Sequence, residues 1–177
     1  TMYGESLVPH EWIAQILFAI SVNLMGLSGS VLLTALVIGL TFLIVHMDMV
    51  KRGAPTLVAA FVVIWTAAAS SIHWLARPHI FTLLFIAIWT YLLEQERNGI
   101  RRNTLVFPAL MLAWANTHGA FIAGFVVWGA YFAEWVFLYL QKEPNKKLGT
   151  RLAVIGMTSL AVTFINPSGY HLWEISL

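Results

Sequence analysis

Long apolar runs, separated by short polar stretches rich in glycine and proline, dominate the chain. The runs cover residues 31–50, 55–75, 80–94, 105–116, 120–139 and 152–165. About 20 apolar residues in a helix cross the hydrocarbon core of a bilayer. The runs 31–50, 55–75 and 120–139 have that length, whereas the other three cross only with tilt or local thinning of the bilayer. The pattern therefore predicts about six spans.

The first apolar stretch, residues 12–27, differs from the others. Gln15 and Asn23 interrupt it, and Gly26 ends it. A stretch of this length favours an interfacial or re-entrant helix over a span. We therefore expect an all-α fold, a polytopic transmembrane helix bundle forming one domain over residues 1–177. Within it, residues 1–28 form an outer loop with the interfacial helix, and residues 29–177 form the six spans.

Composition places the chain among membrane proteins. Hydrophobic residues make up 59% and charged residues 10%, whereas about 25% of the residues of a soluble domain are charged. The net charge of +2 is too small to indicate a nucleic-acid partner, and the absence of cysteine excludes disulfides and thiolate chemistry. The lipid bilayer is the expected partner.

Basic residues fall on one side of the predicted bundle. If six spans alternate, nine of the ten cationic residues share that side: Lys51, Arg52, Arg97, Arg101, Arg102, Lys142, Lys146, Lys147 and Arg151. The excess of lysine and arginine in cytoplasmic loops makes this side cytoplasmic. The remaining cation, Arg77, lies on the outer side. We expect a multi-pass protein of the cell inner membrane, with its working face toward the periplasm or exterior.

Polar residues gather in the outer connections. Three tight turns, at residues 77–79, 116–119 and 166–169, lie between or beside short spans. Irregular backbone below the headgroups is tolerated only where it is buried in protein or lines a wet cavity. We therefore expect these turns to floor one outward-facing cavity.

Each turn also has a purely structural interpretation. Arg77 and Pro78 suit a helix start, with the arginine reaching headgroup phosphates. Alternatively, the guanidinium binds a phosphate through two parallel hydrogen bonds. The turns at 116–119 and 166–169 can equally be capped turns. The histidines show no tight ligand spacing, so we assign no metal ligands; the cofactor stays unknown, with a divalent metal one option.

Three short motifs carry a family resemblance. They are "RPHIF" from Arg77, "WANTHGAF" from Trp114 and "NPSG" from Asn166. Together they resemble bacterial membrane glycosyltransferases of the GT-C type, which use polyprenyl-phosphate sugars. Such enzymes have an acidic residue near the end of their first span, which acts as catalytic base or metal partner. The resemblance places that span and its acid before Thr1, so we expect the sequence to be a fragment.

The residues and the resemblance together define a candidate site. The expected catalytic residues are His118 and His79, because histidine transfers protons near neutral pH. The expected substrate-binding residues are Arg77, Asn116, His73, His10 and Glu11. The expected activity is transfer of a sugar from a polyprenyl-phosphate donor at the outer face. The alternative is a non-catalytic accessory subunit that packs against partner membrane subunits.

Overall fold

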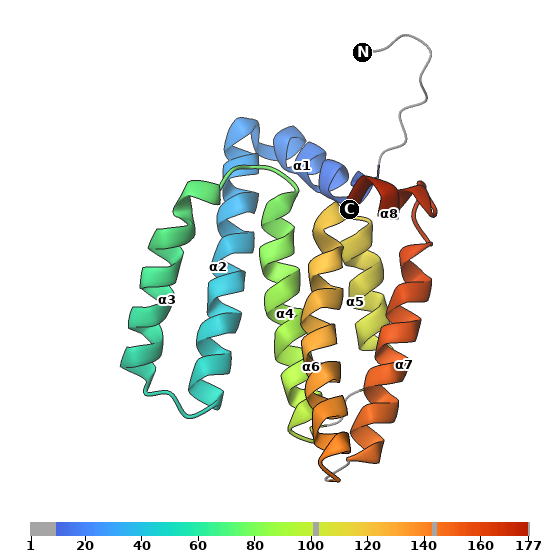
Figure 1. Cartoon of the computed structure of the whole chain (residues 1–177). Coiled ribbons are helices and arrows are strands. Elements are labelled where there is room, and N and C mark those ends of the chain that lie inside the picture. Colours follow the sequence, from blue (N-terminus) through green and yellow to red (C-terminus); the bar gives the residue numbers. More distant parts are fainter. Residues whose placement is uncertain (1–9, 101–102, 143–144, 177) are drawn as a thin grey trace.

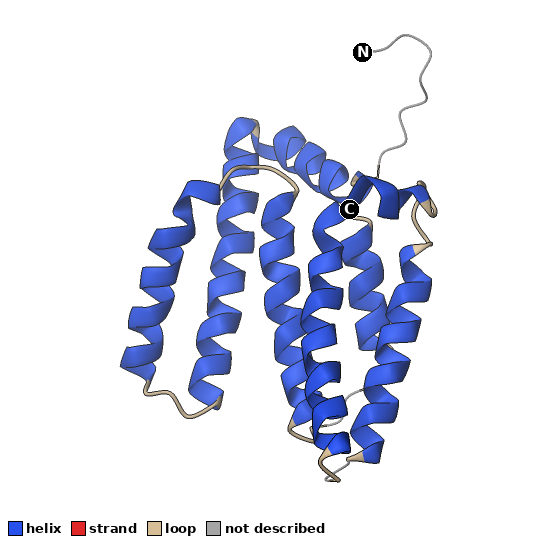
Figure 2. Cartoon of the chain, in the orientation of Figure 1, coloured by secondary structure: helices blue, strands red, loops and turns tan. Residues whose placement is uncertain are grey.

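The computed structural model describes residues 10–100, 103–142 and 145–176. Within those ranges every regular element is a helix and no strand occurs (Figure 2). The all-α prediction is thus confirmed for the described residues. The elements are α1 (Trp12–Met25), α2 (Leu27–Lys51), α3 (Thr56–Ser70), η1 (Ser71–His73), α4 (His79–Arg97), α5 (Val106–Ala115), η2 (Gly119–Phe121), α6 (Ile122–Leu140), α7 (Lys146–Thr163) and α8 (His171–Ser176).

Helices α2 to α7 stand side by side, and α1 and α8 lie across one end of them (Figure 1). The connections α3–α4, α5–α6 and α7–α8 lie at that same end, which we call the histidine end. The connections α2–α3, α4–α5 and α6–α7 lie at the opposite end, which we call the basic end. The alternation expected from the sequence therefore holds for the arrangement of the helices.

The corner between α1 and α2 depends on two glycines. Gly26 has φ +63°, a conformation that side chains with a Cβ rarely adopt. A Cβ on Gly29 would lie only 1.9 Å from the carbonyl oxygen of Ser21. The chain can therefore turn sharply here and bring α1 against α2, which leaves α1 lying across the end of the bundle.

Two apolar clusters hold the helices together. The larger cluster contains residues of all the helices from α4 through α8, including η2, and Trp89, Phe107 and Trp114 are fully buried in it. The smaller joins α1, α2 and α4 around Ala14, Val37 and Ile80. Helix α3 belongs to neither cluster and buries only Ala59. The bundle therefore has a dense half and, at α3, an open edge.

Three helices of the described residues are long and apolar enough to cross a membrane. They cover Leu27–Lys51, Thr56–His73 and Gly119–Leu140. The six expected spans are not shown, because α5 has only 10 residues and charged residues occupy the ends of α4 and α7. Helix α7 begins at Lys146, six residues before the predicted run, because lysine and arginine continue a helix that hydrophobicity alone does not detect.

Most of the basic residues gather as expected. Lys51, Arg52, Arg97 and Lys142 end α2, α4 and α6, while Lys146 and Arg151 lie in the first turns of α7, all toward the basic end. Arg101 and Arg102 lie outside the described residues.

Candidate functional site

An acid and a histidine face each other at the histidine end. Glu11 immediately precedes α1, and His118 lies in the turn between α5 and η2. Glu11 Oε1 lies 3.6 Å from His118 Nε2, and each side chain is 23% exposed. The corner at Gly26 lets α1 reach back across the bundle, which brings these two side chains together.

The other ring nitrogen of His118 is held from within the protein. The backbone N–H of Ala120 donates to His118 Nδ1 over 3.0 Å, which makes His118 the N-cap of η2. Thr82 Oγ1 lies 3.3 Å from the same nitrogen and accepts a hydrogen bond from Trp114 Nε1 over 3.1 Å. The ring therefore has one side tied to the scaffold and one side directed at Glu11.

The surroundings of His118 disfavour its protonated form. Burial lowers the pKa of His118, and the nearby histidines His79 and His10 lower it further, while Glu11 opposes the shift. The net direction is below the ordinary value of histidine. The neutral imidazole is thus favoured over the imidazolium, and His10, Glu11 and His79 are close enough to His118 to act on it electrostatically.

His79 lies at the start of α4 and is tied to the preceding turn. Its Nε2 lies 2.7 Å from the carbonyl oxygen of His73. Since a carbonyl only accepts, Nε2 carries the proton and Nδ1 is the basic nitrogen. His79 is half-buried, whereas the side chain of His73 is exposed.

Asn116 serves the scaffold of the site. It is 3% exposed, and its Nδ2 donates to the carbonyls of Leu112 and Ile165, over 2.9 Å each. Its Oδ1 accepts from Trp12 Nε1 over 2.7 Å and from Asn166 Nδ2 over 3.2 Å. Every hydrogen-bonding position of the amide is thus occupied, so this geometry does not support the substrate contact expected of Asn116.

Asn166 is a second scaffold residue, which the predicted site did not include. Its Nδ2 also lies 3.1 Å from the carbonyls of His10 and Ala115. Its Oδ1 accepts from the backbone N–H of Ser168 over 2.8 Å. The side chain therefore ties the turn after α7 to the start of α1. The sequence signal was the Asn-Pro-x-Gly turn, which alone indicates a turn and no partner.

Arg77 stands apart from the Glu11–His118 pair. Its side chain is exposed, and no ion pair or hydrogen bond links its guanidinium to another described residue. The structure thus brings together His10, Glu11, His79 and His118, but no hydrogen bond or ion pair links them to the guanidinium of Arg77 in the described part of the chain. The described residues also contain no group of three His, Asp or Glu side chains placed to hold a metal ion.

An apolar groove lies between α2, α3 and α4. Its volume is about 380 Å³, and Phe42, Leu83 and Ile86 are among its lining residues. Thr66 and Ser70 also line it, but each hydroxyl donates to a carbonyl of its own helix. Asp48, which is paired with Arg52, and Tyr91 also line the groove. The rest of its surface is mainly apolar and lies beside two helices long enough to cross a membrane.

Ion pairs tie the helices together at the basic end. Arg97 Nη2 lies 2.6 Å from Glu134 Oε1, and Arg97 Nη1 lies 3.2 Å from Glu94 Oε1. Tyr131 donates to Glu94 over 2.9 Å, and Arg52 lies 3.3 Å from the same acid. Glu134 is a candidate on sequence grounds as the acid deepest in a predicted span, although one isolated acid does not make a proton relay. The spacing of Glu94 and Arg97 is that of neighbours on a helix face.

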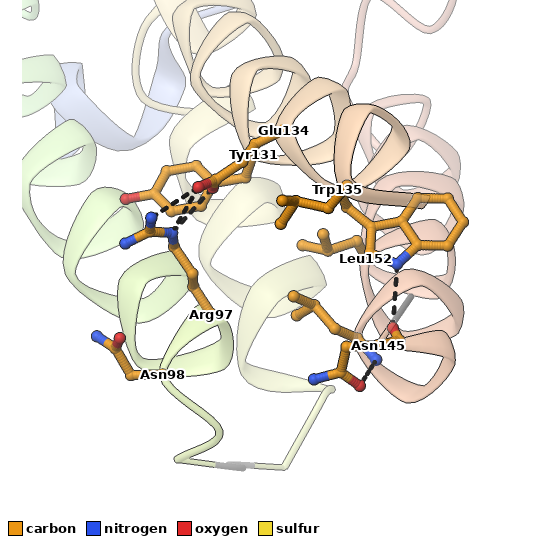
Figure 3. Close-up of a pocket in the computed structure, with 9 residues that line it drawn as sticks. Arg97, Asn98, Tyr131, Glu134, Trp135, Asn145 and Leu152 are labelled. Carbon is orange, nitrogen blue, oxygen red and sulfur yellow. Dashed lines mark hydrogen bonds and ion pairs between the residues drawn. The ribbon is translucent and has the colours of Figure 1, made fainter. Parts of the chain in front are cut away.

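A cavity of about 350 Å³ adjoins this network, between α4, α6 and α7 (Figure 3). Arg97 and Glu134 point toward each other on one side of it, and Trp135 donates to the carbonyl of Asn145 on the other. Arg97 is already bound to two carboxylates, one of them on α6, and Trp135 is bound to the residue before α7, so these two side chains join helices.

Comparison with protein-family models, with curated proteins and with solved structures gives no match for this chain. The chemistry of the site is therefore the basis for assigning a function.

Proposed function

We propose that this chain belongs to a membrane transferase that moves a sugar from a lipid-phosphate donor to an acceptor hydroxyl at the histidine end. The observation that carries the proposal is the pairing of Glu11 with His118, in which a carboxylate faces Nε2 of a half-buried imidazole at 3.6 Å. Paired groups of this kind serve general acid–base catalysis, for which the proton acceptor must lie beside the reacting hydroxyl.

The step that the pair would catalyse is a displacement at the anomeric carbon of the sugar. The acceptor oxygen forms a bond to that carbon while its proton passes to the carboxylate of Glu11. The bond between the anomeric carbon and the phosphate oxygen breaks, and the lipid phosphate leaves with the electron pair. His118 would hold the carboxylate in position, and His79 would lie close enough to assist through its basic Nδ1.

Two further features suit a lipid-phosphate donor. Arg77 is exposed at the histidine end with no described partner for its guanidinium, and a guanidinium binds phosphate oxygens in pairs. The groove between α2, α3 and α4 is apolar enough for a polyprenyl chain. His73 and His10 lie at the same end and would contact the headgroup or the sugar.

The membrane orientation is part of this proposal. We take the basic end as cytoplasmic, because loops rich in lysine and arginine stay on that side. The histidine end then faces the periplasm or exterior of the inner membrane, with α1 in the interface. Helices α4, α5 and α7 would complete six spans, with the short α5 covered by α4 and α7.

Transfer measured with the full protein and a polyprenyl-phosphate sugar tests the proposal. We expect Glu11→Gln to lower kcat by about 10²- to 10⁴-fold, the usual contribution of a general base. Glu174→Gln is the matched control, because Glu174 also pairs with a histidine at this end, His171, at 2.8 Å, but is 67% exposed. Equal activity of the two variants would contradict the role of Glu11.

A non-catalytic accessory subunit is the second candidate. Helix α3 favours it, because Phe61, Ile64 and Trp65 are each more than 60% exposed and only Ala59 of this helix is buried. Such a helix suits contact with another membrane subunit as well as with lipid. A protein that binds no lipid-phosphate sugar, yet copurifies stoichiometrically with a membrane partner through α3, would favour this alternative.

A further inference from the structure

Thr82 uses its hydroxyl differently from most threonines of this chain. Six others donate to a carbonyl of their own helix: Thr34, Thr41, Thr66, Thr150, Thr158 and Thr163. This is the usual arrangement for a threonine within a helix. Thr117, in the turn just after α5, donates to the carbonyl of Ala113 in that helix. Thr82, in the first turns of α4, instead faces Nδ1 of His118 across 3.3 Å.

The donors around Thr82 leave one consistent direction for its hydrogen bonds. The indole N–H of Trp114 can only donate, so Thr82 Oγ1 accepts that bond, of 3.1 Å. The backbone N–H of Ala120 can only donate, so His118 Nδ1 carries no proton. The hydroxyl hydrogen of Thr82 can then point at Nδ1. Trp114 thus donates to Thr82, and Thr82 donates to His118.

We infer that Thr82 is a positioning residue, which with the backbone of Ala120 holds His118 in the tautomer that presents Nε2–H to Glu11. In this arrangement the carboxylate of Glu11, and not the imidazole, accepts a proton from a bound hydroxyl. The inference rests on the proposed function for its catalytic meaning. The assignment of the hydrogen bonds stands on the geometry alone.

Protonating His118 would require a hydrogen on Nδ1, since Nε2 already carries one. That hydrogen would meet the N–H of Ala120 and would force the hydroxyl of Thr82 to turn. The groups that act electrostatically on His118 are Glu11 before α1, His10 beside it, and His79 from α4. Burial and the two histidines disfavour the imidazolium. The N–H of Ala120 and the hydroxyl of Thr82 disfavour it too, because both donate to Nδ1.

Long-range ¹H–¹⁵N correlation spectra of the histidine rings test the inference without any substrate. The His118 signals are assigned by their loss in His118→Asn. In the wild-type protein at neutral pH we expect a protonated Nε2 and an unprotonated, hydrogen-bonded Nδ1. A proton on Nδ1 in the wild-type protein would overturn the inference, whether or not any variant folds.

Two substitutions at Thr82 isolate its hydroxyl. In Thr82→Val we expect the Nδ1 resonance to shift in the direction of a weaker hydrogen bond, because only the donor from Ala120 remains, while Thr82→Ser restores the wild-type position. Thr90→Val, the same change on the same helix, is the matched control and should leave the His118 signals unchanged. An unchanged Nδ1 resonance in Thr82→Val, or no recovery in Thr82→Ser, would also overturn the inference.

Transfer kinetics separate this inference from the proposed function. Where the wild-type protein transfers sugar, we expect Thr82→Val to lower kcat with little change in KM for the lipid donor, and Thr82→Ser to recover it. A wild-type protein that shows the expected tautomer but no transfer would refute the proposed function and leave the positioning of His118 by Thr82 supported.

Discussion

Hydrogen-bonding capacity separates the polar residues of the histidine end into two groups. Asn116 and Asn166 are buried, and their amides are occupied by protein groups. Arg77 is exposed and its guanidinium has no described partner. A buried polar group without a partner costs several kcal/mol in an apolar environment. The two buried amides therefore need their hydrogen bonds to the protein and are not available to a ligand. Arg77 has capacity left for a ligand.

Replacing Arg77 by lysine distinguishes a phosphate site from a headgroup anchor. Lysine keeps the charge but loses the planar pair of donors, so we expect binding of a polyprenyl-phosphate sugar to weaken by about 1–3 kcal/mol. Arg52→Lys, at the basic end, is the control and should not change the affinity. Equilibrium binding measured alongside thermal unfolding checks this. Equal affinity of Arg77→Lys and wild type would mean that Arg77 only reaches headgroups.

The lowered pKa of His118 predicts how stability depends on pH. The unfolded chain binds a proton near the ordinary histidine pKa of about 6.5, whereas the folded protein resists it. As pH falls below that value, His118 therefore lowers the free energy of unfolding until the folded form also protonates. In His118→Asn, where Oδ1 can still cap η2, we expect a shallower loss of stability as the pH falls below about 6.5. Denaturant unfolding at several pH values measures it, and parallel curves would contradict the assignment.

At the scale of elements, α6 and α7 pack through a repeated pair of tryptophan and glycine. A Cβ on Gly156 would lie 2.4 Å from Trp128, and one on Gly149 would lie 2.2 Å from Trp135. Both indoles also donate to carbonyls, Trp128 to Leu152 over 2.9 Å and Trp135 to Asn145 over 3.0 Å. Seven-residue spacing on both helices keeps the contacts on one face.

Gly156→Ala should therefore destabilise the protein. The added methyl group displaces the ring of Trp128 from its place on α7, and overpacking of this kind costs about 1–3 kcal/mol. Gly129→Ala, on α6, is the matched control, because a Cβ there meets nothing within 4 Å. The control should be neutral or slightly stabilising. Thermal unfolding in detergent provides the comparison, and equal melting temperatures of the two variants would exclude the close contact.

Apolar runs predicted where the helices lie better than where they end. The run 105–116 nearly matches α5, whereas α3 ends at Ser70 and not at residue 75. The partner of His118 was only partly predictable. The motif around His118 marked this histidine as a candidate, and Glu11 was a candidate too. Nothing in the sequence indicated that the two side chains would meet. Thr82 was missed, because one threonine in an apolar run has no distinguishing pattern.

At the scale of the whole molecule, most of the described lysine and arginine residues lie at one end and most of the histidines at the other, with Arg77 and His46 as exceptions. Ion pairs at the basic end join α2, α4, α6 and α7, including one between Arg151 and Glu96, at 2.6 Å. The histidine end is held instead by neutral hydrogen bonds of Asn116 and Asn166. Lysine and arginine resist translocation across a membrane, so the separation predicts a fixed orientation.

Single-cysteine labelling in this cysteine-free chain tests the orientation. Asn98 is exposed at the basic end, and His171 is exposed at the histidine end. With a membrane-impermeant thiol reagent added outside intact cells, we expect His171→Cys to react and Asn98→Cys to react only after lysis. Labelling of Asn98→Cys from outside would reverse the orientation and remove the basis for an outward-facing site.

Because of the corner at Gly26, the length of α1 determines where Glu11 lies relative to His118. One end of α1 is fixed to α2 by that corner, and the other is fixed by hydrogen bonds from Trp12 and Ile13 to Asn116. Between them the 14 residues of α1 set how far, and at what angle, Glu11 is carried toward His118. Since each helical residue adds about 1.5 Å and a turn of about 100°, one inserted or deleted residue would rotate the acid away from its partner. Evolution can therefore vary the side chains of α1 that face outward far more freely than its length.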